Sequence, residues 1–157
     1  MAFSILIYDD LMKEYSLKQA QESDIDSVLE LDKENMEQHV VRHYHIIFDP
    51  NANRPIVQKN LGRTKVLYYN EEFVGCYYWS CEIPEIAFLV SIQIREGYRG
   101  NGLGAKLMEI FEQDARNCGC EAVELTVFVD SPARNLYKRL DYKEVDKDHA
   151  VVMSKEL

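Results

Sequence analysis

Long apolar runs, paired cysteines and an excess of positive charge are all missing from this sequence of 157 residues. No segment approaches the roughly 20 apolar residues that a membrane-spanning helix needs. The first ten residues, MAFSILIYDD, contain no basic residue and end on two aspartates, which is not the pattern of a secretory signal. We therefore expect no membrane partner and a cytoplasmic protein, in which these residues form an extra strand or arm.

The cysteines lack the spacing of a metal or redox motif. Cys76, Cys81, Cys118 and Cys120 form no Cys-x-x-Cys pair. Because zinc ribbons and thioredoxin-like sites depend on that spacing, the sequence favours reduced, buried or semi-exposed thiols.

The charge balance is acidic, with 18 Lys and Arg against 27 Asp and Glu and a formal net charge of −9. Nucleic-acid binding depends largely on Lys and Arg that neutralise phosphates, so we expect no nucleic-acid partner. A phosphate-containing ligand would have to be bound locally. An acidic surface also attracts cationic amines.

The order of predicted elements indicates one mixed domain over residues 1–157, without repeats or linkers. Strands are predicted at Glu14–Ala20, in a hairpin over Thr64–Glu82, at Glu85–Ile94 and in the segments 122–130, 142–148 and 150–157. The strand at Glu85–Ile94 reads as buried on both faces. Helices are predicted after a capping box at Ser23 and Asp26, after the glycines near position 100 with a cap at Gly119, and over Ser131–Leu140. A loop with a short helix is expected between His45 and Gly62.

The stretch YRGNGLGAKL, Tyr98–Leu107, places three glycines between a predicted strand and a predicted helix. The first backbone N–H groups of a helix have no partner within it, and they lie at the positive end of the helix dipole. Without side chains in the way, these groups suit a pyrophosphate, and Arg99 adds positive charge. The alternative is a tight turn that needs glycine only for its φ angles.

Two other phosphate motifs fit less well. The Walker pattern fails because no Gly-Lys-Ser/Thr follows at the required distance. Gly100 to Ala105 does satisfy the dinucleotide pattern Gly-x-Gly-x-x-Ala, with Glu124 near the expected acidic position. However, only about a third of the chain follows, which is short for the further βα units of a doubly wound sheet.

The chain resembles the GNAT superfamily of acyl-CoA-dependent N-acetyltransferases over nearly its whole length. The segment Arg99-Gly100-Asn101-Gly102-Leu103-Gly104 is similar to the family's pyrophosphate signature, and ARNLYKRLDYKEV to its Ala-x-x-Leu-Tyr block. LKQAQESD and Val74-Gly75 are similar to its first and third strands. The sequence departs from the family at Asp130, where many members have asparagine, and at Asp141, where glycine is usual.

The resemblance implies a mixed α/β fold, with a twisted, mostly antiparallel sheet of six to seven strands and about four helices. It implies acetyl-CoA as co-substrate and no metal. The resemblance further implies that main-chain groups of one strand and the glycine turn hold the cofactor. These residues are Ile92, Gln93, Ile94, Arg99, Gly100, Asn101, Gly102, Leu103, Gly104 and Ala105.

The resemblance also implies catalytic residues. A Tyr phenol can protonate a departing thiolate, and Tyr137 stands at the family's general-acid position. For the base, Glu85 resembles the water-activating glutamate of some members, and Glu82 is its rival. From the residues alone, Tyr137 also fits a core tyrosine, and the two glutamates fit solvated residues around Pro84.

The acceptor amine is expected near the first long helix, the proline-containing loop and the hairpin. Candidates are Glu34, His39, His43, Tyr78 and Trp79. His39 and His43 are four residues apart but lack the glutamate of a zinc-protease motif, which favours two exposed histidines on a helix. Alternating aromatics in a hairpin also commonly pack on the sheet.

The resulting prediction is an enzyme that transfers acetyl from acetyl-CoA to a small-molecule or polypeptide amine, with a homodimer as an open option. A non-catalytic CoA-binding module and a NAD(P)-binding oxidoreductase are the alternatives.

Overall fold

The computed structural model describes residues 12–147 and 150–157, so the arm predicted at residues 1–10 lies outside the described part. Seven strands form one sheet in the order β1-β2-β3-β4-β5-β7-β6. Neighbouring strands are antiparallel except β4 and β5, which are parallel. The strands are β1 (Tyr15–Gln19), β2 (Thr64–Tyr69), β3 (Glu72–Ser80), β4 (Ile86–Ile94), β5 (Ala122–Phe128), β6 (Lys143–Lys147) and β7 (Ala150–Glu156).

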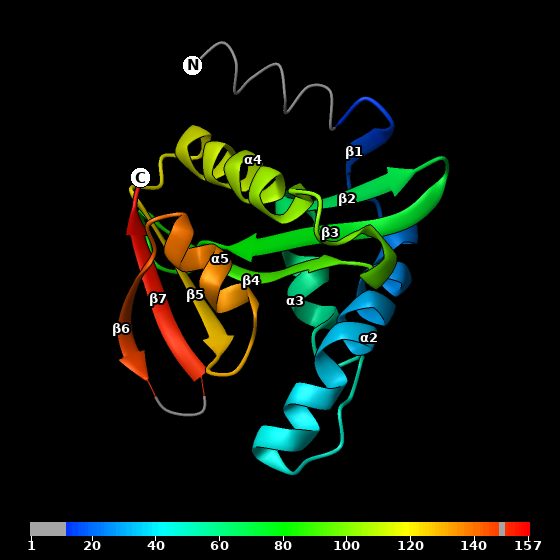
Figure 1. The fold of residues 1–157 in the computed structure, drawn as a ribbon. Helices are drawn as coiled ribbons and strands as arrows, with labels where there is room; N and C mark the ends of the chain where they lie inside the picture. The colour runs from blue at the N-terminus through cyan, green and yellow to red at the C-terminus, as the bar shows by residue number, and fades with distance from the viewer. Residues whose placement is uncertain (1–11, 148–149) are drawn as a thin grey trace.

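The helices cover both faces of this sheet. Helices α4 and α5 lie on one face, and α2 and α3 lie on the other (Figure 1). The four α-helices of the described residues are α2 (Ile25–Tyr44), α3 (Arg54–Lys59), α4 (Leu103–Asn117) and α5 (Ala133–Arg139). Short 3₁₀ turns are η1 (Glu22–Asp24), η2 (Leu61–Arg63) and η3 (Glu96–Tyr98). Within the described ranges, no helix is both long and apolar enough to cross a membrane.

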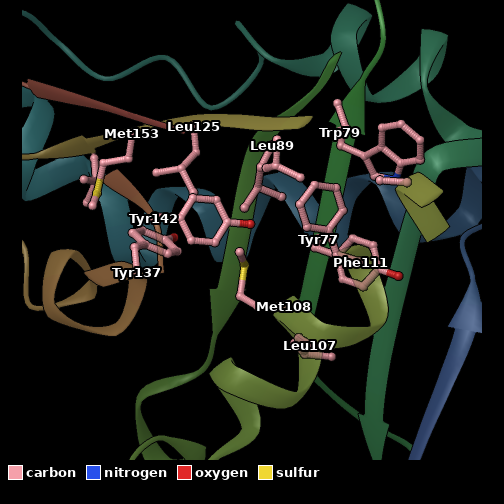
Figure 2. Packing of buried hydrophobic residues seen from close by; sticks show 14 of the residues in the cluster. Tyr77, Trp79, Leu89, Leu107, Met108, Phe111, Leu125, Tyr137, Tyr142 and Met153 are labelled. Carbon is pink, nitrogen blue, oxygen red and sulfur yellow. The ribbon is translucent and has the colours of Figure 1, made fainter. Parts of the chain in front are cut away.

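Two hydrophobic cores follow from the alternation of side chains along β3. Tyr77 and Trp79 point to the face of α4 and α5, where both pack against Phe111 of α4 (Figure 2). Cys76 and Tyr78 point to the opposite face and pack with α2 and α3. Because β3 is covered on both faces, almost all of its residues are buried, as a period of two predicts for a central strand.

The predicted fold class is confirmed: the sheet is mixed, mostly antiparallel and flanked by four helices. The short helix between His45 and Gly62 is α3, and Gly119 has the positive φ of a helix cap, 85°. Asp141, which stands where the family usually has glycine, has a φ of 70°, a conformation that Asp tolerates better than most residues. The hairpin turn lies at Asn70 and Glu71, which have positive φ.

Two local predictions differ from the structure. The capping box before the long helix involves Gln21 and Asp24 rather than Ser23 and Asp26, because a 3₁₀ turn precedes α2. Strand β4 is not buried on both faces, and Phe88 is 36% exposed. Its second half borders open space, since β5 no longer accompanies it there.

The separation of β4 from β5 is the feature that creates this space. The two strands pair only from Ile86 with Ala122 to Leu89 with Leu125. At the same point the register of β4 against β3 shifts, so that Val90 has no opposite residue. An extra residue of this kind bends a strand and increases its twist. Beyond Leu89, β4 therefore diverges from β5 and leaves its main chain without a strand partner on that side.

Candidate functional site

A pocket of about 560 Å³ occupies the opening between β4 and β5. Ligands bind at such places because the carboxyl ends of parallel strands present backbone groups that no neighbouring strand uses. Helix α2 borders the pocket on one side of the sheet, and α5 and the start of α4 border it on the other. Of the predicted cofactor residues, all but Asn101 line this pocket: Ile92, Gln93, Ile94, Arg99, Gly100, Gly102, Leu103, Gly104 and Ala105.

The glycine turn has a backbone that other residues rarely adopt. Gly100 and Gly102 have φ of 84° and 89°, and Gly102 is the N-cap residue of α4. Lys106 donates its N–H to the carbonyl of Gly102 and so makes the first bond of the helix. The N–H groups between these residues are therefore available at the positive end of α4, where an anion is favoured.

Gly104 has a different role from the two turn glycines. A Cβ at this position would lie 3.2 Å from Cδ2 of Leu136 in α5. This is closer than ordinary carbon–carbon contact, so glycine at this position lets α4 pack against α5 beside the pocket.

Arg99 is tied to the end of β4. Its Nε donates to the carbonyl of Ile94 at 2.9 Å, and its Nη2 donates to Oδ1 of Asn35 at 2.6 Å. Asn35 in turn donates to Oε1 of Gln93 at 2.8 Å and to the Ile94 carbonyl at 3.2 Å. The guanidinium is thus held at the pocket wall by α2 and β4 together.

A buried carboxyl lies behind this wall. Asp32 of α2 is 3% exposed and accepts hydrogen bonds from Ser91 at 2.7 Å and from Tyr78 at 2.6 Å. Burial raises the pKa of Asp32, although the hydrogen bonds from the two hydroxyl groups act in the opposite direction. Ser91 also lines the pocket and accepts a bond from Gln93, so the network connects Asp32 to the strand that borders the opening.

Asp32 and Asn35 are site residues that were not predicted from the sequence. Asp32 lies on the apolar stripe of α2, seven residues after Ile25 and four after Val28, where a carboxyl needs partners to be buried. A carboxyl on that stripe could therefore have been recognised from the sequence as a buried, hydrogen-bonded group. Asn35 gave no signal, because its partners lie 58 to 64 residues away along the chain.

Tyr137 lies at the edge of the pocket with only 6% of its surface exposed. It packs against Tyr142 with ring centroids 5.8 Å apart, as Figure 2 shows. Burial raises the pKa of its phenol, with no contribution from a neighbouring charge or hydrogen bond. The group therefore stays protonated at neutral pH and can donate a proton or hydrogen bond into the pocket.

The two glutamates predicted as bases lie outside this pocket. Glu85 precedes β4, at the end of the strand far from the glycine turn, and its carbonyl accepts N–H bonds from Glu121 and Ala122. Its φ of 70° is that of a turn residue. Glu82 is exposed and pairs with Lys59 at 2.6 Å, which lowers its pKa. The structure does not bring either carboxylate to Tyr137.

The fold places the residues considered for the acceptor site in different parts of the molecule. Tyr78 and Trp79 are buried in the two cores and line neither this pocket nor the polar hollow described next, because both faces of β3 are covered. Glu34 lines a second, polar hollow of about 730 Å³ on the outer side of Asn35 and Arg99. His39 lines the pocket itself, and both His39 and His43 are half-buried rather than exposed.

Comparison with known sequences gives one family. The sequence model of the acetyltransferase (GNAT) family matches residues 25–142, which include the opening between β4 and β5, the glycine turn and α5. A search of curated protein sequences finds no match.

Solved structures with the same fold are numerous, at low sequence identity. Ard1 from Thermoplasma volcanium is 18% identical with a TM-score of 0.77, over 92% of this chain and 98% of that one. PaiA N-acetyltransferase from Thermoplasma acidophilum, in complex with coenzyme A, is 14% identical with a TM-score of 0.70 over 91% and 99%. Arabidopsis thaliana Naa50, in complex with the bisubstrate analogue CoA-Ac-MVNAL, is 17% identical with a TM-score of 0.70 over 92% and 99%.

Proposed function

Because the chain belongs to the acetyltransferase (GNAT) family, we propose that it transfers an acetyl group from acetyl-CoA to a primary amine by direct attack in a ternary complex. The observation that carries this proposal is the opening between β4 and β5, which has the glycine turn at one end and Tyr137 at its side.

The glycine turn supports binding of the CoA pyrophosphate. The N–H groups at the start of α4 would donate to its oxygens, and the left-handed conformation of Gly100 and Gly102 directs the backbone toward the pocket. The pantetheine arm contains amide groups, and Ile92 to Ile94 have no strand partner on the side of β5. An extended ligand can therefore pair with β4 as an added strand would.

The proposed chemical steps use β4 on one side of this opening and Tyr137 on the other. A neutral amine attacks the thioester carbonyl carbon, and negative charge develops on its oxygen, which a backbone N–H of β4 would stabilise. The C–S bond then breaks, and Tyr137 donates to the sulfur as charge accumulates there. A phenol with a raised pKa remains protonated until that moment, as a general acid must.

The acceptor proposed is a polypeptide or small-molecule primary amine. Support for the polypeptide comes from relatives of the same fold, since Naa50 is described with an acetylated MVNAL analogue. The fold gives little support to a dinucleotide-binding oxidoreductase, because only one strand pair among the described strands is parallel and a doubly wound sheet requires several.

The first test is thermal unfolding with acetyl-CoA, CoA or NADH. A ligand at about 100 times its dissociation constant stabilises a fold by about 2.7 kcal/mol, which raises the midpoint by roughly 5 to 10 °C for a domain of this size. We expect that rise with acetyl-CoA and CoA but not with NADH. A rise with NADH alone would contradict the proposal.

The second test is turnover with acetyl-CoA and three amines: the peptide Met-Val-Asn-Ala-Leu, spermidine and butylamine, followed by release of the CoA thiol. Acetylation of at least one amine is expected. Binding of acetyl-CoA without turnover of any of the three would instead support a non-catalytic CoA-binding module.

A further inference from the structure

A cluster of two imidazoles and a carboxylate lies at the edge of the pocket. His39 and His43 follow each other by one turn on α2, so they point to the same side of the helix. Both rings stack on Phe128, the last residue of β5, with centroids 5.5 and 4.9 Å away. Asp130 accepts a hydrogen bond from Nε2 of His43 at 2.9 Å, and the three side chains offer ligand atoms within 4.8 Å of one another.

The carboxylate in this cluster is negatively charged at neutral pH. The hydrogen bond from His43 is the main cause that lowers the pKa of Asp130, and Arg42 contributes through an ion pair of 3.1 Å to the other carboxylate oxygen. A fixed negative charge near an imidazole favours its protonated form. The cluster is therefore suited to hold a proton that arrives on an imidazole.

His39 is the member of the cluster that lines the pocket. It enters from α2, whereas Tyr137 enters from α5, and these helices lie on opposite faces of the sheet (Figure 1). A proton donor on one face of the sheet and a proton acceptor on the other can act on different atoms of the reacting molecules. No carboxylate side chain among the described residues lines this pocket, so His39 is the group there that can serve as a base near neutral pH.

We propose that His39 takes the proton from the acceptor ammonium, and that His43 and Asp130 position its ring and stabilise the imidazolium that forms. This inference rests on the proposed acetyl transfer. The neutral amine then forms the C–N bond, the C–S bond breaks, and Tyr137 protonates the leaving thiolate. The second proton that the nitrogen loses returns through solvent to Tyr137 and restores its phenol. The proton on His39 passes to solvent, so that one proton is released for each amide and CoA thiol formed.

Several charged or titratable groups surround His39. On α2 these are Arg42 and His43, and Asp130 follows β5. The other charged or titratable groups that line the pocket are Arg99, Arg139 and Tyr137.

The decisive variant is His39→Gln, assayed with Met-Val-Asn-Ala-Leu between pH 7 and 9.5. A terminal amine with a pKa of about 8 is neutral in about one molecule in ten at pH 7 but almost fully neutral at pH 9.5. We expect kcat/KM to fall about tenfold at pH 7 and less than twofold at pH 9.5, because bulk water then removes the proton. For butylamine, whose pKa is near 10.4, the loss at pH 7 should be larger.

His45→Asn is the matched control, since His45 is exposed, lies just past the end of α2 with φ of 54° and lines neither pocket. Asparagine tolerates that left-handed conformation, so its kinetics should match the wild type. A His39→Gln defect that is equal at all pH values would indicate a purely structural role and overturn the inference. Unchanged rates would do the same, while leaving the proposed function intact.

Asp130→Asn tests the positioning residues. Removal of the negative charge destabilises the imidazolium, so the acid limb of the pH–rate profile should move to lower pH. An unmoved limb would contradict the role of Asp130.

Loss of wild-type transfer on addition of EDTA, with recovery on Zn²⁺, would assign the cluster to a metal ion instead. Turnover with none of the three amines would overturn the proposed function, and this inference with it.

Discussion

Two glycines before α4 show how the conformation of single residues prepares a binding surface. Gly100 and Gly102 have positive φ, whereas Gly97, three residues earlier, lies in the 3₁₀ turn η3 without it. Neither Gly97 nor Gly100 has a neighbour within 4 Å of where a Cβ would lie. The two positions therefore differ in backbone conformation and not in available space.

Alanine at these positions gives a matched pair of variants. Gly100→Ala should lower the free energy of unfolding by about 1 to 2 kcal/mol, because alanine is strained at positive φ. It should also weaken acetyl-CoA binding, since relief of the strain would move the N–H groups of the turn. Gly97→Ala should be neutral or raise stability by about 0.4 to 1 kcal/mol. Urea unfolding and calorimetric titration with acetyl-CoA measure both effects, and equal behaviour of the two variants would contradict the argument.

Tyr137→Phe isolates the hydroxyl group of the proposed acid. Acetyl transfer should slow by about tenfold or more in kcat, because the thiolate loses its donor. The dissociation constant of CoA and the unfolding midpoint should change little, since the ring remains packed against Tyr142. Steady-state kinetics beside thermal unfolding separate these effects. Equal rates in the two proteins would remove the acid role.

At the scale of elements, the site depends on how α2 and β4 are held together. The bonds of Asp32 and Asn35 join one face of α2 to the side chains of Ser91 and Gln93 and to the main-chain carbonyl of Ile94. Beyond Leu89 this strand has lost β5 as a neighbour but still pairs with β3, and the side chains of α2 add further bonds to that half. The helix therefore stabilises the strand that would hold the cofactor.

On the other side of the pocket, α5 is tied to β6 by charge. Glu144 pairs with Arg134 at 2.6 Å and with Lys138 at 3.2 Å, and Arg134 also donates to the carbonyl of Val129. The hydrogen bond from Arg134 is the first cause that lowers the pKa of Glu144 from 4.5 to about 2. This contact connects the helix that carries Tyr137 to the edge of the sheet.

The lowered pKa of Glu144 predicts a pH-dependent contribution to stability. The contribution is fully present above pH 4.5 and is lost as the pH falls through 2, because the carboxylate is then protonated in both states. Glu144→Gln should therefore be less stable than the wild type at pH 7, and the difference should vanish near pH 2.

Urea unfolding of both proteins at several pH values measures this difference. Glu109→Gln serves as the control, because the ion pair of Glu109 with Lys106 lies within a single helix and joins no two elements. A difference for Glu144→Gln that does not depend on pH would contradict the charge-based explanation.

At the scale of the whole molecule, two cores lie on opposite faces of one sheet, and the sheet is interrupted where β4 and β5 separate. All the groups assigned to the proposed reaction lie around that interruption: the turn before α4, Tyr137 of α5 and His39 of α2. The protein as a whole is acidic, with a net charge of −9, but two arginines, Arg99 and Arg139, line the pocket. Local cations in an acidic molecule suit an anionic cofactor and a cationic acceptor that approach separately.

Local signals in the sequence determined the elements and the glycine turn. Alternation in β3, the glycines before α4 and the cap at Gly119 act through the backbone of neighbouring residues, so they can be read from short windows. The same applies to the residues proposed to bind the pyrophosphate, which are contiguous. The resemblance to one family rests on these contiguous blocks, and the family match over residues 25–142 bears it out.

Only the tertiary structure decided which side chains share the pocket. Glu85 was proposed as a base from its resemblance to a glutamate of some family members, and the direction of β4 places it at the end of the strand far from the glycine turn. Asp130, 87 residues from His43 along the chain, reaches it because β5 ends beside α2. Residue types and their spacing fix local backbone geometry, whereas the meeting of distant side chains depends on strand order, the bulge at Val90 and helix packing, which no short window of sequence contains.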